Sequence, residues 1–177
     1  MKKIFILFTM GFFVSCISNQ KKESFQEPSA ICQINPANGT SVRGEVKFFQ
    51  KNNKVTINVE VQGLSYGLHA IHIHEFGDCS SFDAKSAGGH WNPNNKKHGE
   101  WGSKSHHKGD IANLFADSSG NSSLKFETDL WCLGCKDESY NILGKSIIIH
   151  QGLDDFHSQP SGNAGKRIGC GIISSVL

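Results

Sequence analysis

Short segments in which hydrophobic and polar residues alternate dominate this chain, and helical periodicity is hard to find. In the segments 55–61 and 124–130, every second residue is apolar or threonine. Because successive side chains of a strand point to opposite faces, this alternation predicts half-buried β-strands. Further β-rich runs, separated by clusters of Gly, Asn, Asp and Ser, cover 42–50, 68–74, 111–115, 145–150 and 168–176. About eight strands joined by turns predict an all-β fold, an antiparallel barrel or sandwich.

Two long segments, 75–110 and 151–167, interrupt this rhythm. Both are glycine-rich and without periodicity, and they hold most of the nine histidines. Structureless loops longer than ~12–15 residues are uncommon in compact domains and are usually functional or disordered. The histidines favour function, so we expect two long functional loops that something bound to them puts in order.

Composition narrows the class of protein. The 177 residues include 19 glycines, and only 19% are charged, which favours one turn-rich globular domain. A formal net charge of +2 without a basic run gives no electrostatic footprint for nucleic acid. A hydrophobic content of 37% and a mean hydropathy of −0.33 exclude a disordered chain.

The N-terminus is typical of an export signal. An apolar run over 4–14 follows Lys2 and Lys3, is too short to cross ~30 Å of hydrocarbon as a helix, and precedes Ser15 and Cys16. This order resembles a bacterial lipobox, in which the cysteine is lipidated; an ordinary secretory signal is the alternative.

This interpretation divides the chain into three parts. They are a signal peptide (1–15), a lipidated polar tether (16–29) and a folded domain (30–177). It predicts a location in the bacterial cell envelope, periplasmic or at the surface, with membrane contact through the N-terminal lipid only.

Three histidines are candidates for a first metal site. His72 and His74 lie two residues apart on a predicted strand, so both imidazoles leave the same face. Taken alone, such a pair is more often two surface histidines than a chelate. His150 ends another predicted strand and is free to reach this pair across a folded barrel. Nitrogen-only coordination suits Cu(II).

The long loop carries a second set of donors. It consists of His90, His98, His107 and Asp110. Three neutral nitrogens and one hard oxygen form a reasonable closed tetrahedral set for Zn(II), which would order the loop. His106, next to His107, is the competing donor.

Four ordered motifs in the folded part resemble the copper/zinc superoxide dismutases of the bacterial exported type. They are GLHAIHIHEFGDC (67–79), SAGGHWNP (86–93), HKGD (107–110) and GNAGKRIGCG (162–171). The resemblance implies an eight-stranded Greek-key barrel that converts two superoxide anions and two protons into O2 and H2O2, as an antioxidant defence of the envelope. The alternative is a non-enzymatic copper/zinc delivery or buffering module on the same scaffold. A homodimer and a monomer both stay open, because family dimers use different surfaces in bacterial and eukaryotic members and the resemblance therefore assigns neither the oligomeric state nor a surface.

The resemblance also implies one copper and one zinc ion per subunit and a role for each donor. The implied copper ligands are His72, His74, His90 and His150. The implied zinc ligands are His90, His98, His107 and Asp110, with His107 chosen because His-Lys-Gly-Asp keeps the family's spacing. His90 would be shared, and it would be released on the copper side and protonated when copper is reduced. Arg167 would attract and position the superoxide anion with its permanent charge.

Asp154 matches the family's carboxylate that supports both metal sites. It would accept hydrogen bonds from one copper ligand, His72, and one zinc ligand, His98. Asp155 is the adjacent competitor for this role.

The cysteines divide into two groups. Cys79 and Cys170 match the family's disulfide between the metal-bearing loop and the last strand. Cys32, Cys132 and Cys135 have no role in the family pattern. The Cys-x-x-Cys formed by the last two is a redox pair, a soft site for Cu(I) or a loop staple, with the staple preferred.

Overall fold

A computed structural model describes residues 27–176 of the chain. The expected signal peptide (1–15), Cys16 and most of the expected tether (16–29) lie outside the described residues. Between residues 27 and 176, no helix is long and apolar enough to cross a membrane.

The described part folds into nine strands and one 3-10 helix. They are β1 (Ala30–Pro36), β2 (Arg43–Lys51), β3 (Lys54–Gln62), β4 (Gly67–His74), η1 (Lys85–Ala87), β5 (Asp110–Ala116), β6 (Ser122–Thr128), β7 (Ser146–His150), β8 (Arg167–Ile172) and β9 (Ser174–Ser175). Their hydrogen-bonded order is β5-β4-β7-β8-β1-β2-β3-β6, and β9 pairs with β1. All neighbouring strands are antiparallel. The predicted eight-stranded antiparallel barrel is confirmed, with the short β9 as an addition.

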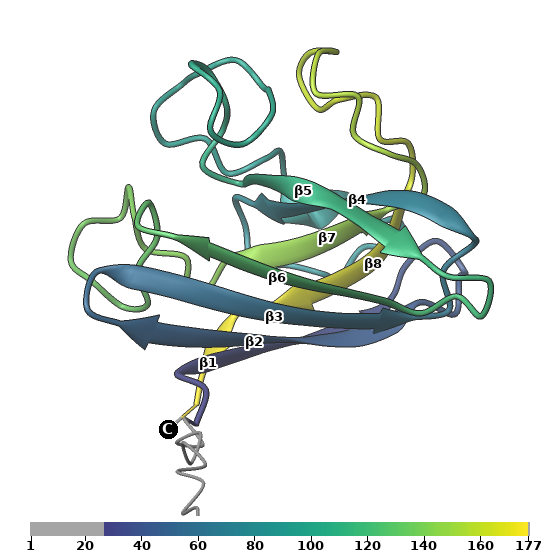
Figure 1. The fold of residues 1–177 in the computed structure, drawn as a ribbon, viewed down its shortest axis with the longest axis horizontal. Helices are drawn as coiled ribbons and strands as arrows, with labels where there is room; N and C mark the ends of the chain where they lie inside the picture. Colours follow the sequence, from purple (N-terminus) through teal and green to yellow (C-terminus); the bar gives the residue numbers. More distant parts are fainter. Residues whose placement is uncertain (1–26, 177) are drawn as a thin grey trace, which may run out of the picture.

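The strands form two layers around one core. In Figure 1, β1, β2, β3 and β6 make the lower layer and β5, β4, β7 and β8 the upper one. Strand β1 joins the layers, because its end pairs with β8 at Asn35 and Pro36. In β3 the alternating Val and Ile side chains are buried while most of their polar neighbours are exposed. The alternation in the sequence therefore identified the core face of this strand correctly.

The sequence pattern missed β1 and displaced two strand ends. The core positions of β1 are Ala30, Cys32 and Ile34, and all three are buried. Ala30 and Cys32 are small, so they give only a weak strand signal in the sequence. The run expected over 168–176 breaks into β8 and β9. Strand β6 stops at Thr128, whose hydroxyl accepts a hydrogen bond from the Leu130 N–H at 2.9 Å.

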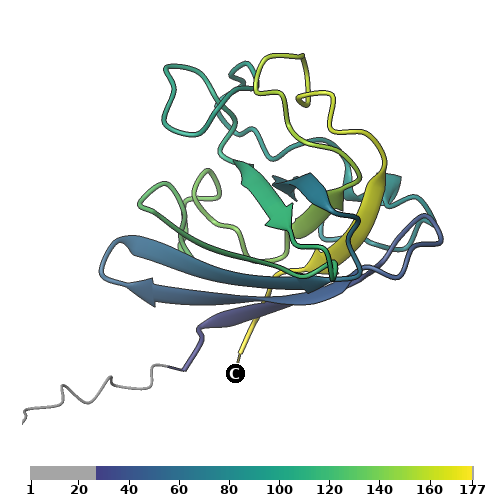
Figure 2. The ribbon, with the colours of Figure 1, turned by 45° about the vertical axis from the view of Figure 1, so that its right-hand side comes forward.

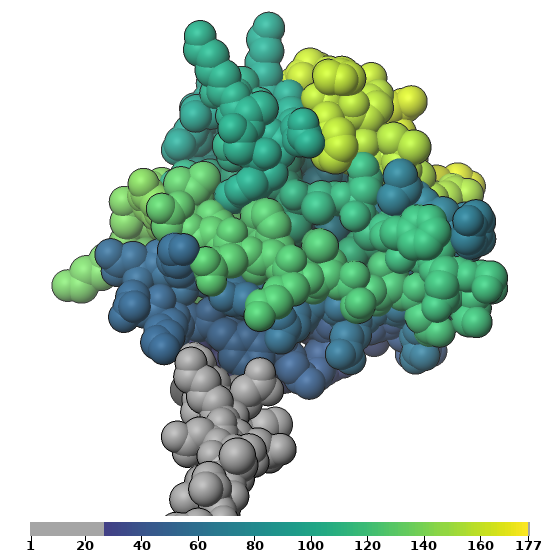
Figure 3. Space-filling model, viewed as in Figure 1, coloured from purple at the N-terminus to yellow at the C-terminus, as the bar shows by residue number. Residues whose placement is uncertain are grey.

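The two long loops fold over the outer face of the upper layer. Residues 75–109 connect β4 to β5 and residues 151–166 connect β7 to β8. Figures 1 and 2 show both loops on the side of the barrel away from β2 and β3, and Figure 3 shows them as neighbouring lobes. They bury the side of β4 that would otherwise face solvent, so His72 and His74 are as buried as Ile71 and Ile73 on the core side.

Two disulfides fix loops. Cys79–Cys170 ties the 75–109 loop to β8, and Cys132–Cys135 lies within the loop 129–145 that connects β6 to β7. Cys32 is the free cysteine of the described residues. Burial raises the pKa of its thiol to about 12, which keeps it protonated and unreactive.

Candidate metal centre

Strand β4 supplies two histidines to a cluster of four. Since side chains alternate along the strand, Ile71 and Ile73 enter the core and the histidines between and after them face the loops. The members of this first cluster are His72, His74, His90 and His150. They are all buried, and each offers a ring nitrogen within 4.8 Å of the others.

The backbone brings the two other histidines to β4. His90 forms an isolated antiparallel bridge with His74, and the following Trp91 donates its N–H to the carbonyl of Ile73 at 2.8 Å. His150 is the last residue of β7, which pairs with β4. The ring centroids of His72 and His90 are 4.0 Å apart. His90 and His150, which are far from β4 in sequence, are thus held beside its two histidines.

A second cluster is organised around one carboxylate. Its members are His90, His98, His107 and Asp110, whose donor atoms lie within 4.8 Å of one another. Asp110 opens β5 and places its carboxylate 2.8 Å from His90 Nδ1, 3.0 Å from His98 Nδ1 and 3.2 Å from His107 Nδ1. His90 belongs to both clusters and presents one ring nitrogen to each.

Several buried ring nitrogens have no hydrogen-bond partner, although an unpaired buried polar atom costs ~1–3 kcal/mol. They are Nδ1 of His72 and His98 and Nε2 of His74, His90 and His150. Their other ring nitrogens are engaged: His72 Nε2 lies 2.8 Å from Asp154 Oδ2, and His74 Nδ1 lies 3.0 Å from the carbonyl oxygen of Gly88. A ring that donates from one nitrogen keeps a lone pair on the other, aimed at its neighbours. This pattern fits metal ions, with copper suited to the nitrogen-only cluster and zinc to the cluster with a carboxylate.

Asp154 connects the two clusters. Its Oδ2 lies 2.8 Å from His72 Nε2 and its Oδ1 lies 2.8 Å from His98 Nε2. Gly162 approaches this carboxylate so closely that a Cβ there would sit 1.8 Å from Asp154 Oδ1, and its φ of +65° also favours glycine. The glycine-rich sequence before Arg167 therefore makes room for the bridge.

Two amides that the sequence analysis did not single out hold this bridge from outside. On β5, the Asn113 side chain donates to the carbonyl oxygen of Asp154 at 3.0 Å and accepts from its N–H at 2.7 Å. In the 151–166 loop, the Gln159 side chain accepts from the N–H of His98 at 2.9 Å and donates to its carbonyl at 3.0 Å. Both act on backbone groups, so no spacing of donor types in the sequence marks them.

The competing residues have other roles. Asp155 accepts hydrogen bonds from the N–H groups of His157 and Ser158 and shapes a turn. His106 lies outside the second cluster, with its ring against Trp101 at a centroid distance of 4.8 Å. Of the two adjacent pairs, only Asp154 and His107 face the clusters.

Arg167 reaches the mouth of the first cluster. It lines a cavity of about 640 Å³ together with His74, His90 and His150. Its guanidinium donates to the carbonyls of Ala84 and Gly88, each at 2.7 Å. Burial lowers its pKa, yet guanidinium remains charged near neutral pH. A fixed positive charge at the wall of this cavity can attract a small anion.

The electrostatics differ between the two clusters. Burial lowers the pKa of His74 and His150 well below the usual range, reinforced by neighbouring histidines. It also lowers the pKa of His90, to about 4. Burial opposes the charged form of His98 too, but the neighbouring carboxylates of Asp110 and Asp154 outweigh it and raise its pKa to about 9. His74, His90 and His150 are therefore neutral at pH 7, whereas His98 carries a proton.

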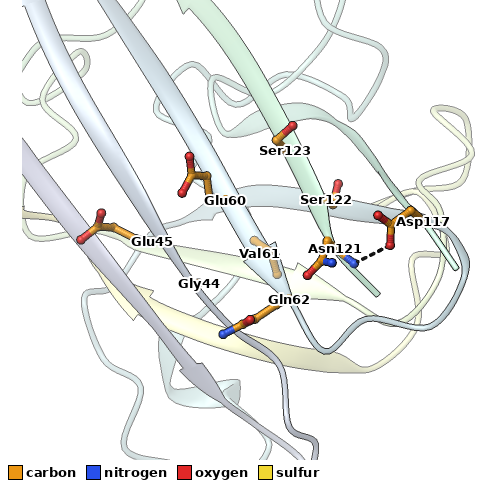
Figure 4. A pocket seen from close by; sticks show the side chains of 9 residues that line it. All are labelled: Gly44, Glu45, Glu60, Val61, Gln62, Asp117, Asn121, Ser122 and Ser123. Carbon is orange, nitrogen blue, oxygen red and sulfur yellow. Dashed lines mark hydrogen bonds between the residues drawn. The ribbon is translucent and has the colours of Figure 1, made fainter. Parts of the chain in front are cut away.

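A second hollow, on the outside of the barrel, offers different chemistry. It lies over β2, β3 and β6, and Figure 4 shows Glu45 and Glu60 on adjacent strands and the hydrogen bond between Asn121 and Asp117. No histidine or cysteine lines it. Within residues 27–176, the two candidate metal clusters both lie under the long loops.

Comparisons with known proteins point in one direction. The family model for copper/zinc superoxide dismutase (SODC) matches residues 42–173. "Superoxide dismutase [Cu-Zn] 1" of Aquifex aeolicus is 40% identical over 133 residues, 73% of this chain and 79% of the relative. An "Extracellular superoxide dismutase [Cu-Zn]" of Brugia pahangi is 34% identical over 156 residues, 82% of this chain and 75% of the relative. A "Copper chaperone for superoxide dismutase" of Rattus norvegicus is 33% identical over 152 residues, 82% of this chain and 53% of the relative.

Proposed function

Because the chain belongs to the copper/zinc superoxide dismutase family, we propose that its two histidine clusters hold one copper and one zinc ion. The activity is superoxide dismutation, the conversion of two superoxide anions and two protons into O2 and H2O2. Copper would be held by His72, His74, His90 and His150. Zinc would be held by His90, His98, His107 and Asp110. The five buried ring nitrogens without hydrogen-bond partners carry this assignment.

Arg167 and His90 are the proposed catalytic residues. Copper, when bound, supplies the Cu(II)/Cu(I) couple that takes an electron from one superoxide and gives it to the next. The Arg167 guanidinium, held by two carbonyls at the cavity wall, binds and orients the anion. His90 Nε2 takes up a proton while Nδ1 stays with the zinc donors, and this proton is delivered to the reduced product.

Asp154 and the disulfide are the proposed supports of this chemistry. By accepting hydrogen bonds from His72 and His98, the Asp154 carboxylate orients one ring of each site and makes both better ligands. The bond between Cys79 and Cys170 ties the 75–109 loop, which carries the two carbonyl partners of Arg167, to the strand that begins with Arg167.

A delivery or buffering module is the alternative function. Such a module has no need of a fixed cation beside the copper donors, and it has no need of a closed zinc set. Arg167 at the cavity therefore favours the enzyme.

The test uses protein loaded with one copper and one zinc, with metal content and superoxide dismutation measured on the same sample. We expect fast turnover that disappears when copper is removed. In His150→Ala, turnover should fall by at least about 1000-fold with copper lost and zinc retained, while the exposed His157→Ala control stays active. Full metal occupancy without turnover in the unmutated protein would favour the delivery module.

We also propose that the protein is exported and tethered by lipid at Cys16, with residues 30–177 as the folded domain. The apolar run ending at Ser15-Cys16 and the polar composition of 17–29 support this. The relatives include bacterial and extracellular enzymes. On expression in a bacterium with a lipoprotein pathway, Cys16→Ser should move the protein from the membrane fraction to the soluble fraction. Unchanged fractionation would contradict the lipid tether.

A homodimer is the proposed assembly. Tyr66 just before β4, Leu68 on β4 and Phe115 on β5 are exposed and adjacent, with the two aromatic rings 5.7 Å apart. A second copy would cover this apolar patch. Sedimentation should then report a dimer that Phe115→Glu converts to a monomer, and a monomeric unmutated protein would refute the proposal.

A further inference from the structure

Lys108 occupies an unusual place for a lysine. It lies between two proposed zinc ligands, His107 and Asp110, and only 6% of its surface is exposed. Lysine is almost never so buried unless it is paired. No carboxylate lies within salt-bridge distance of its ammonium in the described part of the chain. Its stabilising partners are therefore of another kind.

The nearest of those partners come from the 129–145 loop, and the Trp91 ring of the 75–109 loop lies farther from the ammonium, at 5.9 Å. The Trp131 indole N–H donates to the carbonyl of Lys108 at 2.7 Å. The Lys108 ammonium donates to the carbonyl of Ser139 and sits 3.3 Å from the ring centroid of Tyr140. The 129–145 loop therefore contacts both the main chain and the side chain of Lys108.

The Cys-x-x-Cys motif organises that loop. Cys132 and Cys135 form a disulfide directly after Trp131. The N–H of Cys132 donates to the carbonyl of Tyr140 at 2.8 Å, and its carbonyl accepts from Ile142 at 3.0 Å. The motif therefore joins the side that carries Trp131 to the side that carries the partners of the ammonium. Figure 2 shows this loop beside the base of the 75–109 loop.

The next residue is fixed from the opposite side. Gly109 donates to the carbonyl of Trp91 at 3.0 Å and accepts from the N–H of Ile73 at 2.8 Å. A Cβ at Gly109 would lie 2.3 Å from the Ile73 carbonyl oxygen, so the segment lies directly on β4. The chain between His107 and Asp110 is consequently held at Gly109 by β4 and at Lys108 by the disulfide loop.

We propose that the 129–145 loop, closed by Cys132–Cys135, is a clamp that positions the zinc ligands His107 and Asp110 through Trp131 and Lys108. This inference rests on the proposed zinc set and adds a function for the Cys-x-x-Cys motif, which the metal clusters do not use. Trp131 and Lys108 are positioning residues, because they act on the ligands through the backbone. Loss of such outer supports typically weakens metal binding 10–100-fold.

The test measures zinc and copper affinity separately by competition with chelators of known affinity. The variants are Trp131→Phe, which keeps the ring and removes the N–H donor, and Lys108→Met, which keeps the stem and removes the charge. A third variant replaces both cysteines with alanine (C132A/C135A). Lys125→Met is the matched control, since it makes the same change of side chain at an exposed position of β6, outside the 129–145 loop.

We expect zinc affinity to fall about 10-fold or more in the test variants, with copper affinity unchanged and the control like the unmutated protein. Hydrogen exchange of the 107–110 amides in the metal-free variants should also speed up. If the double-cysteine variant does not fold, the two single variants decide. Zinc affinity within about twofold of the unmutated protein in both, with the fold intact, would overturn the clamp. If Asp110→Ala, made in the otherwise unmutated protein, leaves zinc affinity unchanged, both the proposed zinc ligands and the clamp are wrong.

Discussion

The two metal clusters share His90 but are built in different ways. The proposed copper cluster is built mainly on strands. His72 and His74 belong to β4 and His150 ends β7, so the hydrogen bonding of the sheet largely fixes their positions. Three members of the zinc cluster lie in the 75–109 loop, and only Asp110 belongs to a strand. A site built on strands is positioned by the core, whereas a site built on a loop needs supports of its own. Asp154, Gln159 and the 129–145 loop supply them.

The carboxylate at the centre of the zinc cluster gives the largest expected effect. Asp110→Ala removes a zinc ligand and the common partner of three histidines, so zinc affinity should fall by more than about 100-fold and the 75–109 loop should loosen. The strand-borne copper ligands keep their places, and copper binding should weaken far less. Metal analysis and limited proteolysis measure both effects, with the exposed Glu100→Ala as control. Equal loss of the two metals would contradict the difference between the clusters.

The two clusters should differ in how their metal affinity depends on pH. As a proposed zinc ligand, His98 must be neutral when zinc binds, and because its pKa is raised to about 9, binding should release a proton there. Zinc affinity of the metal-free protein should therefore rise with pH up to about 9, by at most about tenfold per unit. His74 and His150 have lowered pKa values and are already neutral, so they add no such rise for copper above pH 6.5. Parallel competition titrations measure both slopes, and identical slopes would refute this assignment.

Reversing the charge of Arg167 at the cavity should change turnover without changing metal binding. Arg167→Glu should slow dismutation at least about tenfold by repelling the anion, and it should reverse the dependence on ionic strength, with both metals retained. Lys166→Glu makes the same change of charge at the neighbouring exposed residue, so it controls for net charge. If both variants slow the enzyme equally, guidance by Arg167 at this position is wrong.

The smallest expected effect comes from Gln159, whose side chain holds the backbone of His98. Gln159→Leu removes both hydrogen bonds to the His98 backbone and should weaken zinc binding by a few-fold to tenfold while copper binding stays constant. Gln151→Leu, in the same loop, is the control. A change in copper affinity alone would show that Gln159 acts on the other site.

The sequence predicted the barrel and the residues that gather in the two candidate donor clusters because both leave local signals. Alternation marked β3, and the types and spacing of His72, His74 and His90 marked donors before any contact was known. Strand β1 escaped because Ala30 and Cys32 are weak markers of a core face. Asn113, Gln159 and Trp131 escaped because they bind backbone groups, which every residue possesses. Only the folded chain reveals which amide or indole meets which carbonyl.

The closing pair of β1 and β9 has a practical consequence for attaching the protein to a support. Ala30 pairs with Ser175, and the N–H of Val176 donates to the carbonyl of Ser29 at 3.1 Å, so both ends of the described chain leave the molecule at one point. In Figure 1 this point lies below the barrel, and the loops over the metal clusters lie above it. An electrode, a bead or a fusion partner linked to either end would therefore leave the cavity open to solution.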